Sequence, residues 1–235
     1  MAAKLISYSM ASKELFDSQS DVRTLEGLIA YCARVSNPEN QQFNKGSDKL
    51  IKYLIKHKHW SPLEMVSVCL EIETTRDIAR QIIRHRSFSF QEFSQRYADP
   101  TDDLKFVLRA ARLQDPKNRQ NSIDLDLEDF GKGGNKTQHE RLAEEWQWQQ
   151  QEVIKAATRA YRWATNNGIA KEQARAVLPE GNTVSRLYMN GTLRSWVHYI
   201  ELRSANGTQK EHIKVADECM KAIIPVFSLM EDLYV

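Results

Sequence analysis

The stretch VSVCLEIE, residues 66–73, sets the expected fold class, because every second residue from Val66 to Ile72 is apolar. A period of two is typical of a strand that buries one face and exposes the other. From about Arg76 the apolar residues recur at the three- and four-residue spacing of a helix. The segment therefore predicts a half-buried strand that leads directly into a helix.

Helical patterns dominate on both sides of this strand. Asp21 is placed to cap the first helix, Gly168 to end the long one, and Pro225 to kink or end the last. Many helices around one strong strand and a few weaker ones predict an α+β fold. The weaker strands are expected over 4–9 and 88–90, and the helices over 24–34, 50–55, 137–166, 192–204 and from about 208.

Length and composition favour one globular domain. The 235 residues predict a single domain over 1–235, with a surface excursion at about 100–140 that includes an acidic run over 124–129. The formal net charge of +2 gives no overall attraction to nucleic acid or to an anionic membrane. No apolar run reaches the ~18–20 residues of a membrane helix, and no secretory signal is visible. The three cysteines form no CxxC pair, so we expect small buried thiols in a reducing compartment, the cytoplasm.

Positive charge is concentrated in residues 76–97, which carry a net charge of +3 while the rest of the chain is near −1. Gln81 and Arg84 are three residues apart, which places them on one face of the expected helix. Guanidinium groups interleaved with aromatic rings suit a planar anionic ligand better than a solvated basic face. Glycine-rich phosphate loops and the GxSxG and HExxH motifs are absent, so their chemistry is not expected. The aromatic residues are Phe88, Phe90, Phe93 and Tyr97.

Two further segments gather polar residues of functional type. In HWSPLE, residues 59–64, the proline fixes a turn directly before the strong strand. A metal ion there would have three candidate ligands, His57, His59 and Glu64. No other ligand cluster has metal-site spacing, so we expect no metal. In the second segment Arg194 and His198 share one helix face, and Arg203 lies near the end of that helix.

The basic segment resembles the signature of the flavin-dependent thymidylate synthases. Arg84-His85-Arg86 is followed after seven residues by Ser94, and then by Gln95-Arg96-Tyr97. The resemblance spans about residues 28–225 and is poor over 100–140. Other segments match the family in the same order, namely 59–64, 174–179, 193–199, Leu202-Arg203 and Gln209.

The resemblance implies a homotetramer built on a central, mainly antiparallel sheet flanked by long helices, with active sites shared between subunits. Arg175 and Arg203 would then reach the site from a different subunit than residues 84–86. It implies FAD as the cofactor, bound by Ser61, Arg84, His85, Arg86, Glu92, Thr192, Arg194 and His198. It implies dUMP as the substrate, held by Gln81, Arg84, Glu92, Ser94, Gln95, Arg96, Arg175 and Arg203.

The implied reaction makes dTMP, with methylenetetrahydrofolate as the one-carbon donor and NADPH-reduced FAD as the hydride source. We expect Arg203 to be catalytic, stabilising negative charge at the N3–C=O edge of uracil. No cysteine lies in a setting that would lower its pKa, so no cysteine nucleophile is expected. Two alternatives remain open: a nucleic-acid-binding module built on the basic helix, and a related flavoprotein that modifies another pyrimidine nucleotide. Three positions depart from the family, since Met65, Gln91 and Thr192 stand where it usually has His, Asn and Asn.

Overall fold

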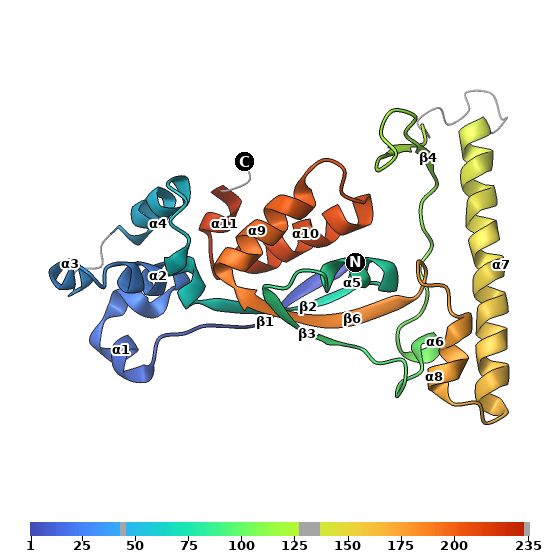
Figure 1. Cartoon of the computed structure of the whole chain (residues 1–235), viewed down its shortest axis with the longest axis horizontal. Coiled ribbons are helices and arrows are strands. Elements are labelled where there is room, and N and C mark those ends of the chain that lie inside the picture. Colours follow the sequence, from blue (N-terminus) through green and yellow to red (C-terminus); the bar gives the residue numbers. More distant parts are fainter. Residues whose placement is uncertain (43–45, 127–136, 233–235) are drawn as a thin grey trace.

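The computed structural model describes residues 1–42, 46–126 and 137–232. Within these residues the centre is a four-stranded antiparallel sheet in the order β1-β2-β6-β3 (Figure 1). The α+β class and the antiparallel sheet are thereby confirmed, and residues 66–73 fall on the second strand as expected. The strands are β1 (Ala2–Tyr8), β2 (Ser67–Thr75), β3 (Phe88–Glu92) and β6 (Val184–Thr192).

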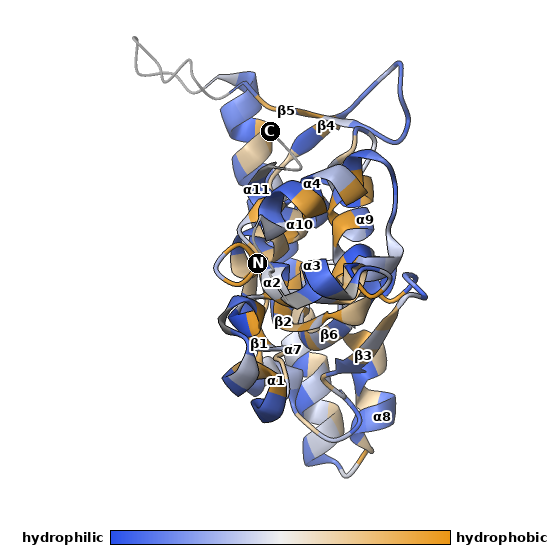
Figure 2. Cartoon of the chain, turned by 90° about the vertical axis from the view of Figure 1, so that its left-hand side faces the viewer, coloured by the Kyte–Doolittle hydropathy of each residue, from blue (hydrophilic) through white to orange (hydrophobic). Residues whose placement is uncertain are grey.

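The main core lies between this sheet and two C-terminal helices, α9 (Leu193–Ser204) and α10 (Lys210–Ile223). The alternation in β2 places Val68, Leu70 and Ile72 inside the core, with partly exposed residues between them. Trp196 of α9 is fully buried, and its Nε1 donates a hydrogen bond to the carbonyl oxygen of Val68 at 2.9 Å. Figure 2 shows hydrophobic residues along α9, α10 and the strands beneath them. The two helices are thereby fixed to the sheet.

Two local expectations were wrong. Thr24, not Asp21, caps the first predicted helix, because its Oγ1 accepts a hydrogen bond from the backbone N–H of Gly27 at 3.1 Å. The helix from Arg76 ends at Ile82, so Arg84 lies beyond it and shares no helix face with Gln81. In the described part of the chain the other α-helices are α1 (Lys13–Ser18), α2 (Leu25–Ala33), α3 (Pro38–Gln42), α4 (Ser47–Lys56), α5 (Arg76–Ile82), α6 (Pro100–Asp103), α7 (Gln138–Asn166), α8 (Lys171–Ala174) and α11 (Leu229–Asp232).

The excursion at about 100–140 contains α6, a hairpin of β4 (Arg112–Gln114) and β5 (Ser122–Asp124), and the start of α7. Part of the predicted acidic run lies outside the described residues. The long helix α7 stands beside the sheet (Figure 1) and begins with a capping box formed by Thr137 and Glu140. Its second half packs on α8 through a small separate core. None of the described helices has the length and apolar character needed to cross a bilayer.

Candidate active site

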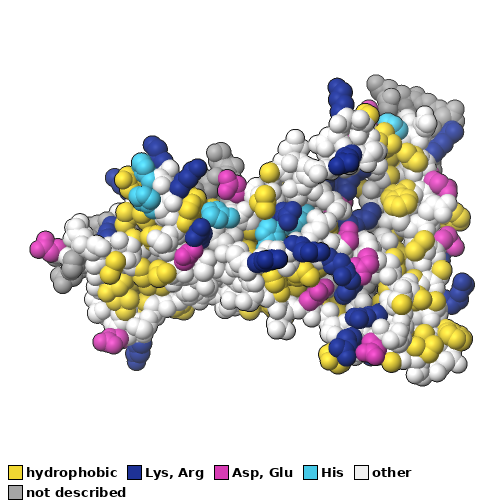
Figure 3. Space-filling model, in the orientation of Figure 1, with side chains coloured by type: hydrophobic (Ala, Val, Ile, Leu, Met, Phe, Trp, Pro, Cys, Tyr) yellow, Lys and Arg dark blue, Asp and Glu magenta, His cyan; other side chains and the backbone are white. Residues whose placement is uncertain are grey.

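Arg84, His85 and Arg86 form the turn that joins α5 to β3. The Arg84 and Arg86 side chains are exposed, and neither forms an ion pair with a described residue. Figure 3 shows a band of Lys and Arg side chains across the middle of one face, beside histidine side chains. Two adjacent guanidinium groups without a carboxylate partner in the described chain suit an anionic ligand.

His85 lies against Arg203, 118 residues away in sequence. The Nε–H of Arg203 donates to Nε2 of His85 at 2.9 Å, so the imidazole carries its proton on Nδ1. Burial, and next to it the positive charge of Arg203, lower the pKa of His85 to about 4. One chain thus already brings Arg203 against the 84–86 turn, and the expected supply of Arg175 and Arg203 from another subunit stays a prediction.

A second group of predicted residues gathers at the other end of β3. The Nε of Arg96 lies 3.3 Å from the Glu172 carboxylate, and the Nε–H of Arg175 donates to the Glu172 carbonyl oxygen at 3.3 Å. Ser94 Oγ accepts a hydrogen bond from the backbone N–H of Arg96 at 3.4 Å. Gln95 is buried, and its Nε2 has no hydrogen-bond partner among the described residues. A hydroxyl and two guanidinium groups thus lie close together, a combination that suits a phosphate.

Gln81 and Glu92, two further predicted substrate ligands, are engaged within the chain. The Glu92 carboxylate accepts a hydrogen bond from Ser185 Oγ at 2.7 Å and lies 3.6 Å from Arg76. Gln81 bonds to Gln209 through its Nε2 at 2.9 Å. Both side chains are only partly exposed, so their orientations are set by these partners.

A third group lies where the 59–64 turn meets the start of α9. Arg194 forms an ion pair with Glu64, and the His198 ring packs edge-on against Trp60 with centroids 4.6 Å apart. Ser61, at the start of the turn, is exposed. The predicted flavin-binding residues of this end therefore lie together.

Comparisons with known proteins decide the family. A family model described as thymidylate synthase complementing protein matches residues 20–227. The probable flavin-dependent thymidylate synthase of Paramecium bursaria Chlorella virus 1 is 47% identical over 227 residues, covering 97% of this chain and 95% of the relative. The flavin-dependent thymidylate synthase of Synechocystis sp. is 48% identical over 202 residues, 86% of each chain. This chain is a member of the flavin-dependent thymidylate synthase family. The resemblance drawn from the motifs is confirmed, and with it the expectation of a flavin-dependent methyltransferase.

A solved structure shares the fold of this flavin-dependent thymidylate synthase. It is a UMP/dUMP methylase, PolB from Streptomyces cacaoi, bound with 5-Br dUMP. The TM-score is 0.71 at 23% identity, with 99% of this chain and 93% of that chain covered. At 23% identity this structural similarity supports a shared fold and does not extend to function.

The residues present fit a flavin dinucleotide. Exposed guanidinium groups at Arg84 and Arg86 supply charge for a pyrophosphate, and the neutral His85 imidazole offers a planar partner. Thr192, which replaces the family's usual Asn, caps α9 by accepting the Ser195 N–H at 3.3 Å. Its hydroxyl is therefore already used in holding the start of the helix. The other two departures, Met65 and Gln91, are exposed and leave the described contacts intact.

The candidate metal ligands make other contacts. The His57 ring packs on Tyr53 with centroids 4.3 Å apart, and the Glu64 carboxylate is paired with Arg194. Among the described residues, no three His, Cys, Asp or Glu side chains come together at metal-binding distances.

Thiol chemistry is also disfavoured in this enzyme. Cys219 is fully buried as expected, whereas Cys32 and Cys69 are partly exposed. Burial raises the pKa of all three thiols, so each is protonated at neutral pH and lacks nucleophilic character.

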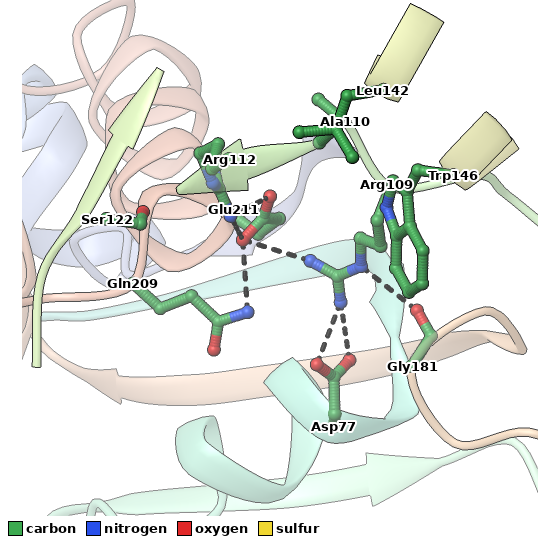
Figure 4. A pocket seen from close by; sticks show the side chains of 11 residues that line it. Asp77, Arg109, Ala110, Arg112, Ser122, Leu142, Trp146, Gly181, Gln209 and Glu211 are labelled. Carbon is green, nitrogen blue, oxygen red and sulfur yellow. Dashed lines mark hydrogen bonds and ion pairs between the residues drawn. The ribbon is translucent and has the colours of Figure 1, made fainter. Parts of the chain in front are cut away.

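Sequence reasoning missed an ion cluster beside Gln209 (Figure 4), the residue whose Oε1 accepts the Gln81 hydrogen bond. Arg109 lies 2.7 Å from Asp77 and 3.1 Å from Glu211, and Arg112 lies 2.7 Å from Glu211. These side chains border a cavity of about 530 Å³ that Leu142 and Trp146 of α7 line on the opposite side. Both arginines belong to the poorly matching excursion, so no motif pointed to them. The only available signal was Gln209, which the C-terminal motif included.

Proposed function

We propose that this flavin-dependent thymidylate synthase converts dUMP to dTMP, taking the carbon from methylenetetrahydrofolate and the hydride from NADPH-reduced FAD. The observation on which the proposal rests is the placement of Arg203. Its guanidinium is partly buried, is bonded to a neutral imidazole, and has no carboxylate partner among the described residues. A partly desolvated cation in that state is stabilised by an anionic ligand.

Arg203 has the properties required to activate the uracil ring. C5 of uracil is a weak nucleophile until the ring is activated, and negative charge develops on the N3–C=O edge during that activation, before C5 attacks carbon. A guanidinium fixed beforehand by His85 stabilises that charge without reorganisation. The raised thiol pKa values leave this electrostatic route as the one the chain's own groups support.

Ser94, Arg96 and Arg175 are the residues proposed to bind the nucleotide phosphate. The Arg175 guanidinium forms no ion pair with a described carboxylate, whereas the Arg96 guanidinium is paired with the Glu172 carboxylate. Bound FAD would be held by residues of the 84–86 turn and of the 59–64 and 192–198 segments, and once reduced it supplies the hydride.

We also propose that the sites are shared between subunits, and the same positions support this. In one chain the 84–86 turn and the Ser94–Arg96 segment flank opposite ends of β3, whose four residue steps span about 13 Å. A second copy would bring complementary groups to each end. The exposed apolar side chains of α7, including Trp148 and Trp163, offer surface for such contacts. We therefore propose a homotetramer, tested by sedimentation at several protein concentrations.

Tritium release from 5-labelled dUMP tests the reaction. Release of tritium and formation of dTMP are expected only when NADPH and methylenetetrahydrofolate are both present. A parallel assay with 5-labelled UMP is the control, because it tests whether the enzyme acts on another pyrimidine nucleotide. The proposal is refuted if the flavin-loaded protein releases no tritium from dUMP, or if it turns over UMP alone. Salt-sensitive oligonucleotide binding by flavin-free protein would support the nucleic-acid alternative.

A further inference from the structure

A continuous line of hydrogen bonds runs from the buried core to the ion cluster. Tyr199 Oη lies 3.1 Å from His212 Nε2, and His212 Nδ1 lies 3.2 Å from Gln81 Oε1. Gln81 Nε2 then contacts Gln209 Oε1 at 2.9 Å, and Gln209 Nε2 contacts the Glu211 carboxylate at 3.0 Å. We call these five residues the Tyr199–Glu211 chain. It links α9, α10 and α5 through the side chain expected to touch dUMP.

The direction of every bond in this chain is fixed by its Glu211 end. Burial raises the pKa of Glu211, but hydrogen bonds from Arg112 and Gln209 and the charge of Arg109 outweigh it and bring the pKa to about 2. An ionised carboxylate only accepts hydrogen bonds, so Gln209 must turn its NH₂ group toward Glu211 and its oxygen toward Gln81. Gln81 must then turn its own NH₂ group toward Gln209.

The same reasoning continues into the core. The Gln81 oxygen faces His212, so Nδ1 of His212 must carry the proton. Nε2 of His212 is then an acceptor, and Tyr199 must donate its hydroxyl hydrogen to it. His212 is fully buried, and burial together with the charges of Arg203 and His85 lowers its pKa to about 3, so the imidazole is neutral. Burial likewise raises the pKa of Tyr199, which keeps the phenol protonated.

We propose that His212 and Tyr199 are positioning residues that, with Glu211 at the opposite end, hold the Gln81 carboxamide in one orientation for the nucleotide. Gln81 then uses its oxygen on His212 and one N–H on Gln209, and its second N–H is left for an oxygen acceptor of the substrate. Without His212 the carboxamide oxygen loses its hydrogen-bond donor, the amide is held by Gln209 alone, and its second N–H is no longer fixed toward that acceptor. The inference rests on the proposed function, because it takes Gln81 as a dUMP contact.

Three substitutions at one position separate positioning from packing. Asparagine places an amide N–H near Nδ1, so His212→Asn keeps the bond to Gln81. His212→Gln reaches toward Nε2 and loses that bond, and His212→Leu loses both. Loss of one oriented hydrogen bond at the substrate predicts a KM for dUMP about tenfold higher in H212Q and H212L, with H212N within about threefold of the wild type. The kcat and the bound flavin should change little.

A pair of tyrosine variants provides a milder test. Tyr199→Phe removes the donor to His212, and a smaller rise in KM for dUMP is expected. Tyr161→Phe is the matched control, because its buried hydroxyl has no hydrogen-bond partner among the described residues and lies in the separate core beneath α7. The KM of Y161F should equal that of the wild type.

The Tyr199–Glu211 chain is also tested by a measurement that does not depend on enzyme activity, namely ¹⁵N NMR of histidine-labelled full-length protein. His212, assigned as the signal that persists when each of the other five histidines is substituted in turn, should be protonated on Nδ1 alone at pH 7. Protonation on Nε2 overturns the proposal, even if the substitutions at position 212 prevent folding. It is equally overturned if active wild-type enzyme and H212L share one KM for dUMP, or if H212N behaves as H212L does. A wild-type protein that makes no dTMP refutes the proposed function instead, and the tautomer measurement still decides whether the chain has the derived direction.

Discussion

Acidification should destabilise this enzyme through His212, and the size of the effect follows from its burial. The pKa of His212 is about 3 in the folded protein, against an ordinary value of 6.5. As the pH falls below about 6.5 the unfolded chain takes up a proton that the folded chain refuses, so the equilibrium moves toward unfolding. The contribution of His212 is complete above pH 6.5 and is lost progressively as the pH falls toward 3.

The linkage gives the magnitude. Between pH 8 and pH 5 a histidine shifted this far loses about 2 kcal/mol of folding free energy, and about 4 kcal/mol is lost by pH 3. His85, with its pKa lowered to about 4, acts in the same direction. The depressed pKa of Glu211 also favours folding at neutral pH, but its effect is lost mainly below its ordinary value of 4.5, so pH 5 largely excludes it.

Urea unfolding of wild-type protein and of H212N, at pH 8 and at pH 5, isolates the residue. Protein concentration and flavin loading are held fixed, because association and ligands shift apparent stability. Wild-type protein should lose about 2 kcal/mol more than H212N over this interval, since asparagine does not titrate. Equal losses in the two proteins would show that His212 is not held neutral by burial, and would refute the reasoning.

Three further predictions concern other parts of the chain. Arg203→Ala should reduce dTMP formation by about 10²–10³-fold or more while the purified protein keeps its flavin absorbance; near-normal turnover would contradict the proposed role. Gly191→Ala places a Cβ 2.4 Å from the Phe88 ring and should cost about 1–3 kcal/mol in thermal unfolding, whereas Gly181→Ala, with no atom within 4 Å of its added Cβ, should cost little. A variant with serine at the two partly exposed cysteines and alanine at the buried one should keep its turnover within about threefold, and loss of dTMP formation would revive a thiol mechanism.

Local signals in the sequence predicted most of the secondary structure. The alternation over residues 66–73 placed a strand with the correct buried face, and Gly168 marked the end of the long helix. The cap of the first helix was misassigned because Asp21 and Thr24 both have suitable side chains, and the choice depends on backbone geometry. The order of strands in the sheet depends on pairing between distant segments, which a local pattern does not contain.

Contacts between distant charged residues were the least predictable part of the site. Arg109 and Arg112 stand in a stretch with weak periodicity, and arginines in such a stretch are usually solvated. Their partners Asp77 and Glu211 lie 32 and 99 residues away. The Tyr199–Glu211 chain was hidden for the same reason, because Gln81 and His212 are 131 residues apart.

Counter-ions separate the motif arginines into two groups, although the sequence presents them alike. Arg76 and Arg80 bind Glu180, so these two cations are neutralised within the chain and serve the fold. A second set, Arg84, Arg86, Arg175 and Arg203, has no carboxylate partner among the described residues. A guanidinium that has no carboxylate partner in the folded chain is stabilised more by an anionic ligand than one that is already paired. The arginines most able to bind flavin and nucleotide phosphates are therefore those that the fold leaves unpaired.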